Sequence, residues 1–161
     1  MKTEKWQLSH LNNIFSAFLQ NKLYFKGSFI LNLKGKSMSK LNIYKAMGSL
    51  AYAMAMADGK IQEEEKVSIK KMALEEFELS DIDNAWITTM FKEMEENSIT
   101  LEDAYQFSID TLEANRFAFD FDEAMKNKCL KFIERTAEAF GGVEYAERAI
   151  LKRLKNDLSK F

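Results

Sequence analysis

The sequence contains no proline among its 161 residues and only six glycines. Proline breaks helix interiors, and proline and glycine together mark the turns of sheet-rich folds. Their scarcity therefore favours long, uninterrupted helices. Apolar residues make up 47% of the chain and charged residues 30%, which is typical of a globular protein and not of a disordered one. The length predicts one domain with an extension, large enough to bury a proper core.

Cysteine and histidine occur once each, as Cys129 and His10. A single cysteine cannot form an internal disulfide, and these two residues cannot supply the four nitrogen or sulfur ligands of a structural zinc site. Cys129 lies on the apolar face of a predicted helix, so we expect it to be a small core residue. The scarcity of cysteine is typical of a reducing compartment, and we expect a cytoplasmic protein.

Long hydrophobic runs are also missing. The first ten residues lack the apolar segment that a signal peptide needs. The most apolar predicted helix, 43–57, is about 15 residues long and contains Lys45, whereas roughly 20 apolar residues are needed to span a bilayer. We therefore expect no membrane span.

Positive charge is concentrated at one end of the chain. Residues 1–50 contain eight lysines and one acid, a net charge of +7, and residues 51–161 contain 15 basic and 24 acidic residues, a net charge of −9. A basic arm of this kind can contact its own acidic body, or it can bind an external anionic surface or partner. The basic residues are not interleaved with aromatic residues in a nucleic-acid-binding pattern, so we expect no nucleic acid partner.

Apolar residues recur at helical spacing in seven segments, and the prediction is an all-α fold, a compact bundle of six to seven helices. Segment 42–57 is rich in small side chains, which allow neighbouring helices to approach closely, so we expect it to be the central helix. The predicted helices are 4–20, 42–57, 63–77, one from 80 or 81 that includes Met94, one that starts after Thr100, 122–140 and 144–160.

Two regions of different character divide the chain. Residues 1–40 form a predicted basic extension of one helix, then a short hairpin or irregular segment that runs to Lys40. Residues 41–161 form the predicted helical domain.

The helical domain contains a degenerate internal repeat. When residues 57–72 are aligned with 139–154, four of the 16 pairs are identical, for example Glu65 with Glu147, and five more are similar. Each copy predicts the end of one helix, a glycine-containing turn, an apolar anchor and a new helix. Two related helix-turn-helix units are therefore expected within one fold.

The first copy of the repeat is strongly acidic. Asp58 lies in the turn, and Glu63, Glu64 and Glu65 open the next helix. Carboxylate oxygens in such a turn can bind a hard divalent cation, although the spacing is not that of an EF-hand. An alternative stays open: an acid in the first helical turn complements the helix dipole, and Glu65, three residues after Gln62, can return a capping hydrogen bond to the helix start.

These residues carry a family resemblance. The motif Ala57-Asp58-Gly59-Lys60-Ile61, followed by Glu63-Glu64-Glu65-Lys66 and preceded by a helix of small and apolar residues, resembles the TerB-like family of tellurite-resistance proteins. The same arrangement occurs in the cytosolic part of a membrane-anchored DnaJ-type co-chaperone. The resemblance covers roughly residues 41–158, and in the second copy Phe140 stands where Asp58 stands in the first.

The resemblance implies a compact all-α fold that acts in bacterial stress responses or envelope-associated complexes. It also implies that Asp58, Glu64 and Glu65 form an acidic cation site; Ca²⁺, Mg²⁺, Mn²⁺ and Zn²⁺ are all candidates. We therefore expect a non-enzymatic module that binds a divalent cation or a protein partner, which can itself be membrane-associated. The alternative is an interaction scaffold that uses the basic arm and has no metal site. A hydrolase is disfavoured because it would need a pocket that shifts the pKa of one carboxyl group and a second, differently placed acid, and the sequence indicates neither.

Overall fold

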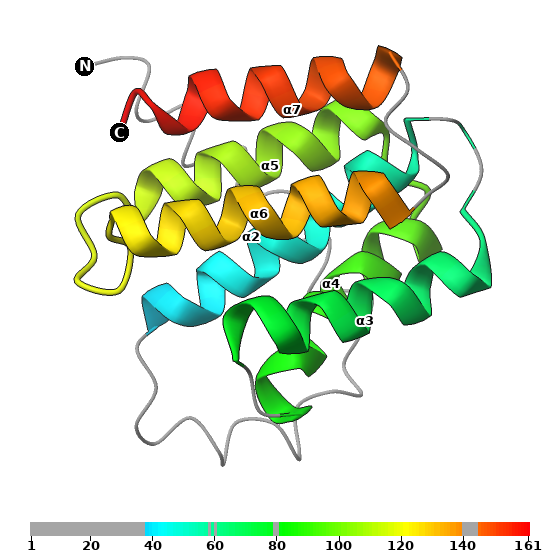
Figure 1. Cartoon of the computed structure of the whole chain (residues 1–161), viewed down its shortest axis with the longest axis horizontal. Coiled ribbons are helices and arrows are strands. Elements are labelled where there is room, and N and C mark those ends of the chain that lie inside the picture. Colours follow the sequence, from blue (N-terminus) through cyan, green and yellow to red (C-terminus); the bar gives the residue numbers. More distant parts are fainter. Residues whose placement is uncertain (1–37, 58, 60, 79–80, 140–144) are drawn as a thin grey trace. The chain divides into compact units, whose positions relative to one another are not determined.

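The computed structural model describes residues 38–57, 59, 61–78, 81–139 and 145–161, which belong to the second of the two units of the chain, Ser37–Phe161. These residues form six helices and no strand (Figure 1). The helices are α2 Met38–Ala55, α3 Glu63–Phe77, α4 Asp81–Glu96, α5 Leu101–Ala114, α6 Glu123–Ala139 and α7 Tyr145–Leu158. The predicted all-α fold is confirmed. The predicted helix 4–20 and hairpin lie outside the described residues.

Helix boundaries agree with the sequence pattern except at α2. Helix α3 spans the predicted residues, whereas α2 begins at Met38, four residues before the predicted start. The prediction that the irregular segment continues to Lys40 is therefore wrong. Met38 and Lys40 are good helix formers, and Lys40 Nζ lies 3.8 Å from an Asp120 carboxylate oxygen before α6, which favours a helical start at this point.

Helix α2 is the central helix, as its small side chains predicted. It contacts α4, α5 and α6, and it is buried along nearly its whole length. A Cβ atom placed on Gly48 would lie 2.3 Å from the backbone oxygen of Ile87 in α4, so the two backbones meet at this glycine. Ser49 Oγ donates a 2.8 Å hydrogen bond to the Ala104 carbonyl of α5 on another side of α2. Close approach on two sides therefore fixes α2 in the bundle.

Aromatic side chains connect α2, α3 and α6 in the core. The ring of Tyr44 lies edge-on to Phe77, with centroids 5.9 Å apart, and Phe77 contacts Phe132 at 5.5 Å. Cys129 lies on the same helix as Phe132 and is fully buried, which confirms the prediction of a small core residue. Burial raises the pKa of the Cys129 thiol well above its ordinary value.

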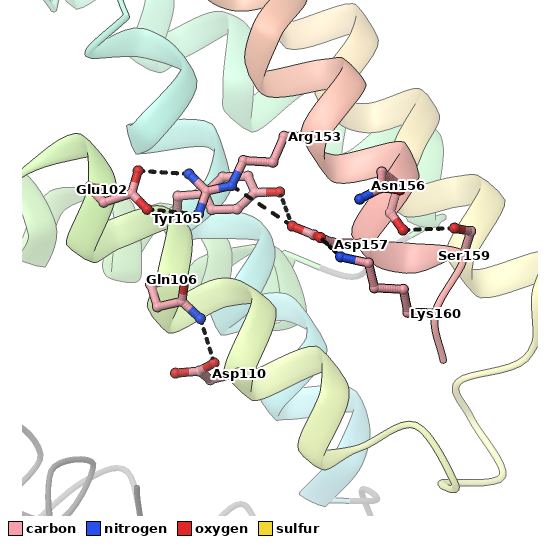
Figure 2. Close-up of polar contacts among 9 residues, drawn as sticks. All are labelled: Glu102, Tyr105, Gln106, Asp110, Arg153, Asn156, Asp157, Ser159 and Lys160. Carbon is pink, nitrogen blue, oxygen red and sulfur yellow. Dashed lines mark hydrogen bonds and ion pairs between the residues drawn. The ribbon is translucent and has the colours of Figure 1, made fainter.

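A polar cluster joins α5 to α7 (Figure 2). The hydroxyl of the buried Tyr105 donates a 2.8 Å hydrogen bond to Asp157, which also accepts one from Lys160 at 2.6 Å. The guanidinium of Arg153 lies 4.0 Å from the centre of the Tyr105 ring and forms two 2.7 Å hydrogen bonds with Glu102. These five side chains, called the α5–α7 cluster below, hold the last helix against the bundle.

Ion pairs fix the outer helix α3 to α6. Glu76 is buried near the end of α3, and its carboxylate lies 3.1 Å from Lys131 Nζ and 3.5 Å from an Arg135 nitrogen. Arg135 also pairs with the neighbouring Glu75. Because a buried carboxylate is costly without a partner, these two cations offset the cost of burying Glu76 between α3 and α6.

The membrane prediction can be compared with the helices. No helix within the described parts of the chain has both the length and the hydrophobicity needed to cross a bilayer.

Candidate functional site

The candidate site is the corner between α2 and α3, residues 56–66. Helix α2 unwinds through backbone hydrogen bonds from Ala57 N–H to the Met54 carbonyl and from Gly59 N–H to the Met56 carbonyl, both 3.1 Å long. Gly59 has φ +83°, a left-handed conformation that costs glycine little and other residues more. Ile61 then packs against the core and anchors the chain before α3 begins.

Glu65 closes the corner from inside α3. Its Oε2 accepts a 2.7 Å hydrogen bond from the backbone N–H of Gln62, the residue that precedes the helix, as in a capping box. Glu65 is buried, although it lies in the first turn of an exposed helix end. The capping role that the sequence left open for Glu65 is therefore confirmed.

The other two glutamates of the first turn face solvent. The side chain of Glu63 is 83% exposed, and its carboxylate accepts a 2.6 Å hydrogen bond from Lys66. Lys66 also lies 2.8 Å from Glu95 at the end of α4, so it connects α3 to α4. Hydrogen bonds to the two carboxylates raise the pKa of Lys66 and keep it charged. Glu64 is exposed next to them, and its backbone carbonyl accepts a hydrogen bond from Ser68.

The three predicted cation ligands, Asp58, Glu64 and Glu65, differ in what the structure shows of them. Asp58 lies outside the described residues. Glu65 is engaged with the helix start, and Glu64 is exposed on the helix surface. Within the described ranges no three acidic, histidine or cysteine side chains gather closely enough to hold a metal ion. A cation site at this corner therefore stays a prediction, because it depends on Asp58.

The second copy of the repeat has the same local design where it can be compared. Glu147, the counterpart of Glu65, is the third residue of α7 just as Glu65 is the third residue of α3, and both are buried. Met72 and Leu154 are likewise both buried. The turn residues 140–144 lie outside the described part of the chain. Within the described residues, the two glutamates therefore share a helix position and burial, and the capping hydrogen bond is shown for Glu65.

Three further acidic residues, Asp120, Asp122 and Glu123, lie near the opposite end of α2. Asp120 pairs with Lys40 in the first turn of α2, whereas the corner follows the last turn (Figure 1). Asp122 Oδ1 accepts a 2.8 Å hydrogen bond from the Met125 N–H and caps α6. Asp122 is therefore a cap of α6, and the pairing of Asp120 with Lys40 places Asp120 at the end of α2 that is remote from the corner.

A shallow cleft lies beside the corner, between α3 and α4. Its volume is about 380 Å³, and its floor includes Ile69 and Phe91. Its rim carries two acids and two lysines, Glu63, Glu95, Lys66 and Lys92. Because the rim charges balance, the cleft has no clear preference for a cationic or an anionic ligand.

Sequence reasoning missed one surface feature, the connection between α5 and α6. Phe117 is 89% exposed and Phe119 is 97% exposed, whereas Phe121 is buried. The available signal was the alternation of phenylalanine with other residues over 117–121, a period of two that cannot belong to one face of a helix. A pattern of this kind between two helices indicates that some of the aromatic residues point outward.

Comparison with protein-family models, with curated proteins and with solved structures finds no match.

Proposed function

We propose that this chain is a non-enzymatic, TerB-like helical module that binds a basic segment of a partner protein at the corner between α2 and α3. One observation carries the proposal. Glu65 is used to fix the helix start, while Glu63 and Glu64 remain at the surface of the same turn. The corner therefore presents carboxylates from a backbone that is already ordered, which lowers the entropy cost of binding. The family resemblance extends the proposal to bacterial stress responses.

The charge of the helical unit supports a basic partner. The unit Ser37–Phe161 contains 17 basic and 24 acidic residues, a net charge of −7, and a negative net charge attracts and orients a positively charged partner. The first three residues of α3 are all glutamates, and they add negative charge at the corner. The basic residues 1–40 of the chain itself are one source of competing charge, so the test uses the full chain.

The proposal can be tested with a fluorescent octalysine peptide titrated into the full chain. Glu63→Gln combined with Glu64→Gln removes two charges from the corner but leaves Glu65 in place. Glu113→Gln combined with Glu123→Gln is the matched control, because Glu123 is also the first residue of its helix and also pairs with a lysine at 2.6 Å. We expect about fivefold weaker binding for the corner variant and less than twofold for the control. Equal effects would remove the corner as the binding site.

A divalent cation is the second candidate ligand, favoured by the exposed side chain of Glu64 and by the predicted ligand Asp58, which lies six residues before it in the sequence. Calorimetric titration of the full chain with Ca²⁺, Mg²⁺, Mn²⁺ and Zn²⁺ tests it directly. We expect heat from at least one ion in the natural chain and a weaker signal in Asp58→Asn. Absent heats, or equal heats in both proteins, would leave the peptide-binding role as the sole function proposed for the corner.

A further inference from the structure

The connection between α5 and α6 exposes two large aromatic side chains on one short segment. Phe117 and Phe119 are 89% and 97% exposed, among the highest values for large apolar residues in the described part of the chain. A single exposed apolar residue is ordinary, but two phenylalanines separated by one residue concentrate apolar area at one point. Phenylalanine also contributes strongly to protein interfaces, where aromatic anchors are enriched.

The segment is held in place by its own backbone. The N–H of Ala118 donates to the Asn115 carbonyl at 2.9 Å, and the N–H of Phe121 donates to the Ala118 carbonyl at 3.0 Å. Phe121 is buried and packs against Phe161 at a ring distance of 6.3 Å. Consecutive turns and a buried anchor therefore keep the exposed rings presented to solvent.

The charges around the two rings are largely paired. Arg116 lies over the Phe117 ring at 4.6 Å and pairs with Glu113 at 3.4 Å. Lys40 pairs with Asp120, and Lys126 pairs with Glu123. With Asp122, which caps α6, the four acids and three bases around the segment give a net charge of −1.

This charge pattern separates two classes of partner. Stable binding to an anionic membrane surface normally combines an apolar anchor with a cluster of basic residues. The segment has the apolar anchor but a slightly acidic rim. Aromatic residues at the centre of a polar, charged rim are instead the arrangement of a protein interface.

We propose that residues 115–123 are a second docking surface, in which Phe117 and Phe119 insert into an apolar cleft with a basic rim on a partner protein. This surface and the acidic corner lie near opposite ends of α2 (Figure 1). One module can therefore contact a partner at two separate points, and the second surface does not depend on the function proposed for the corner.

The probe for this surface is a display library of three-helix domains with randomised residues along one groove between two helices. Binders are selected on the immobilised full chain, without directing them to any surface. The purified binders are then titrated against the natural chain, against Phe117→Ser combined with Phe119→Ser, and against Val67→Ser. Val67 is the matched control because it is 71% exposed and lies on α3, away from this connection.

We expect most selected binders to lose at least about tenfold in affinity for the double variant and to be unaffected by Val67→Ser, because a few large side chains that become buried at the centre of an interface carry most of its binding energy. Their grooves should be apolar and bordered by lysine or arginine. Thermal unfolding should be unchanged in the double variant, because both rings are exposed in the natural fold. Binders that recognise the double variant as well as the natural chain would overturn the proposal.

Two other occupants are tested with the same variants. Vesicles of phosphatidylcholine, with and without 30% phosphatidylserine, are sedimented with the natural chain and with the double variant. The amount of protein that sediments with the vesicles should be the same for both. Analytical ultracentrifugation should show the same oligomeric state for the natural chain and for the double variant. Phenylalanine-dependent vesicle binding would identify a membrane surface as the occupant, and phenylalanine-dependent dimers would identify a second copy of the chain; either result would overturn the proposal.

Discussion

Gly48 shows how one residue can set the distance between two helices. A Cβ atom at this position would lie 2.3 Å from the Ile87 carbonyl oxygen and 2.9 Å from Met90 Cβ, and the nearest atom belongs to the backbone, which cannot rotate away. Gly59 is glycine for a different reason: a Cβ atom there would meet no neighbour, but its φ is +83°. Replacement of glycine by alanine therefore tests helix packing at position 48 and backbone conformation at position 59.

Gly48→Ala should lower the free energy of unfolding by about 2–3 kcal/mol, because α2 and α4 must separate to admit a methyl group. Alanine has the higher helix propensity, so propensity alone would predict the opposite sign. Gly59→Ala should cost about 1 kcal/mol, from the left-handed backbone alone. Urea denaturation of the two variants measures both effects. A Gly48→Ala protein as stable as the natural one would contradict the close approach of these helices.

Glu65 acts at the corner through the backbone of α3. Glu65→Ala should lower the free energy of unfolding by about 1–1.5 kcal/mol, because the Gln62 N–H loses its partner and the first turn of α3 frays. Glu64→Ala, at an exposed position in the same turn, should change it by less than about 0.5 kcal/mol. Urea denaturation with amide hydrogen exchange at the start of α3 distinguishes the two. Equal destabilisation would show that the hydrogen bond of Glu65 contributes nothing.

At the scale of elements, the α5–α7 cluster is the clearest electrostatic contact between helices. Partial burial acts to raise the pKa of Asp157, but hydrogen bonds from Lys160 and Tyr105 and the nearby charge of Arg153 outweigh it, so this pKa lies below its ordinary value. Burial and the hydrogen bond to Asp157 raise the pKa of Tyr105 above its ordinary value, so the phenol stays protonated and donates. A hydrogen bond from Arg153 lowers the pKa of Glu102.

Asp157→Asn should lower the free energy of unfolding by about 1.5 kcal/mol at pH 7, because hydrogen bonds to a charged acceptor are lost. The folded-state pKa of Asp157 is depressed, so its stabilisation is present above the unfolded value of about 3.9 and is lost as the pH falls through the folded value. The difference between variant and natural protein should therefore shrink below about pH 4.

Urea denaturation between pH 7 and pH 2.5 measures this dependence, with Asp110→Asn as the control. Asp110 also accepts a hydrogen bond on α5, from Gln106, but this pair lies outside the cluster (Figure 2). A difference between Asp157→Asn and the natural protein that is independent of pH would contradict the charged role of Asp157.

Helices could be predicted from the sequence because their apolar spacing is local. The α3 boundaries and the burial of Ile69, Met72 and Phe77 follow from a period of 3.6 residues. The α5–α7 cluster could not be predicted, because Tyr105 and Asp157 are 52 residues apart and spacing does not show which helices face each other. The early start of α2 was not predicted because the Lys/Gly/Ser-rich composition before Leu41 gave no clear helical pattern.

At the scale of the whole molecule, the α2–α3 corner could be identified from the sequence, but the geometry of its side chains could not. Glu65 and Glu147, which are aligned in the repeat, are both buried third residues of helices, and Glu65 has the capping role that the sequence left open. Whether a first-turn glutamate faces its own helix start or solvent depends on the turn before it, and sequence spacing allowed both. The exposure of Phe117 and Phe119 was not predicted, because phenylalanine is apolar and is expected to be buried in the core.

The two proposed surfaces near opposite ends of α2 suggest a small acidic adaptor. The unit that carries them has a core formed around one central helix, and the net charge of Ser37–Phe161 is −7. In the proposed function, each of the two surfaces would contact a different part of a partner, and the bundle between them would set the distance between the two contacts. A basic partner segment should therefore perturb one end of the described bundle and leave the other unchanged.

Amide chemical shifts of the ¹⁵N-labelled full chain, recorded during titration with octalysine, test this claim most directly. The largest shifts should fall on residues 61–66 at the start of α3, with little change over residues 115–123, and they should diminish when Glu63 and Glu64 are replaced by glutamine. Shifts spread evenly over the acidic surface, or centred on another helix and unchanged in that variant, would contradict recognition at the corner.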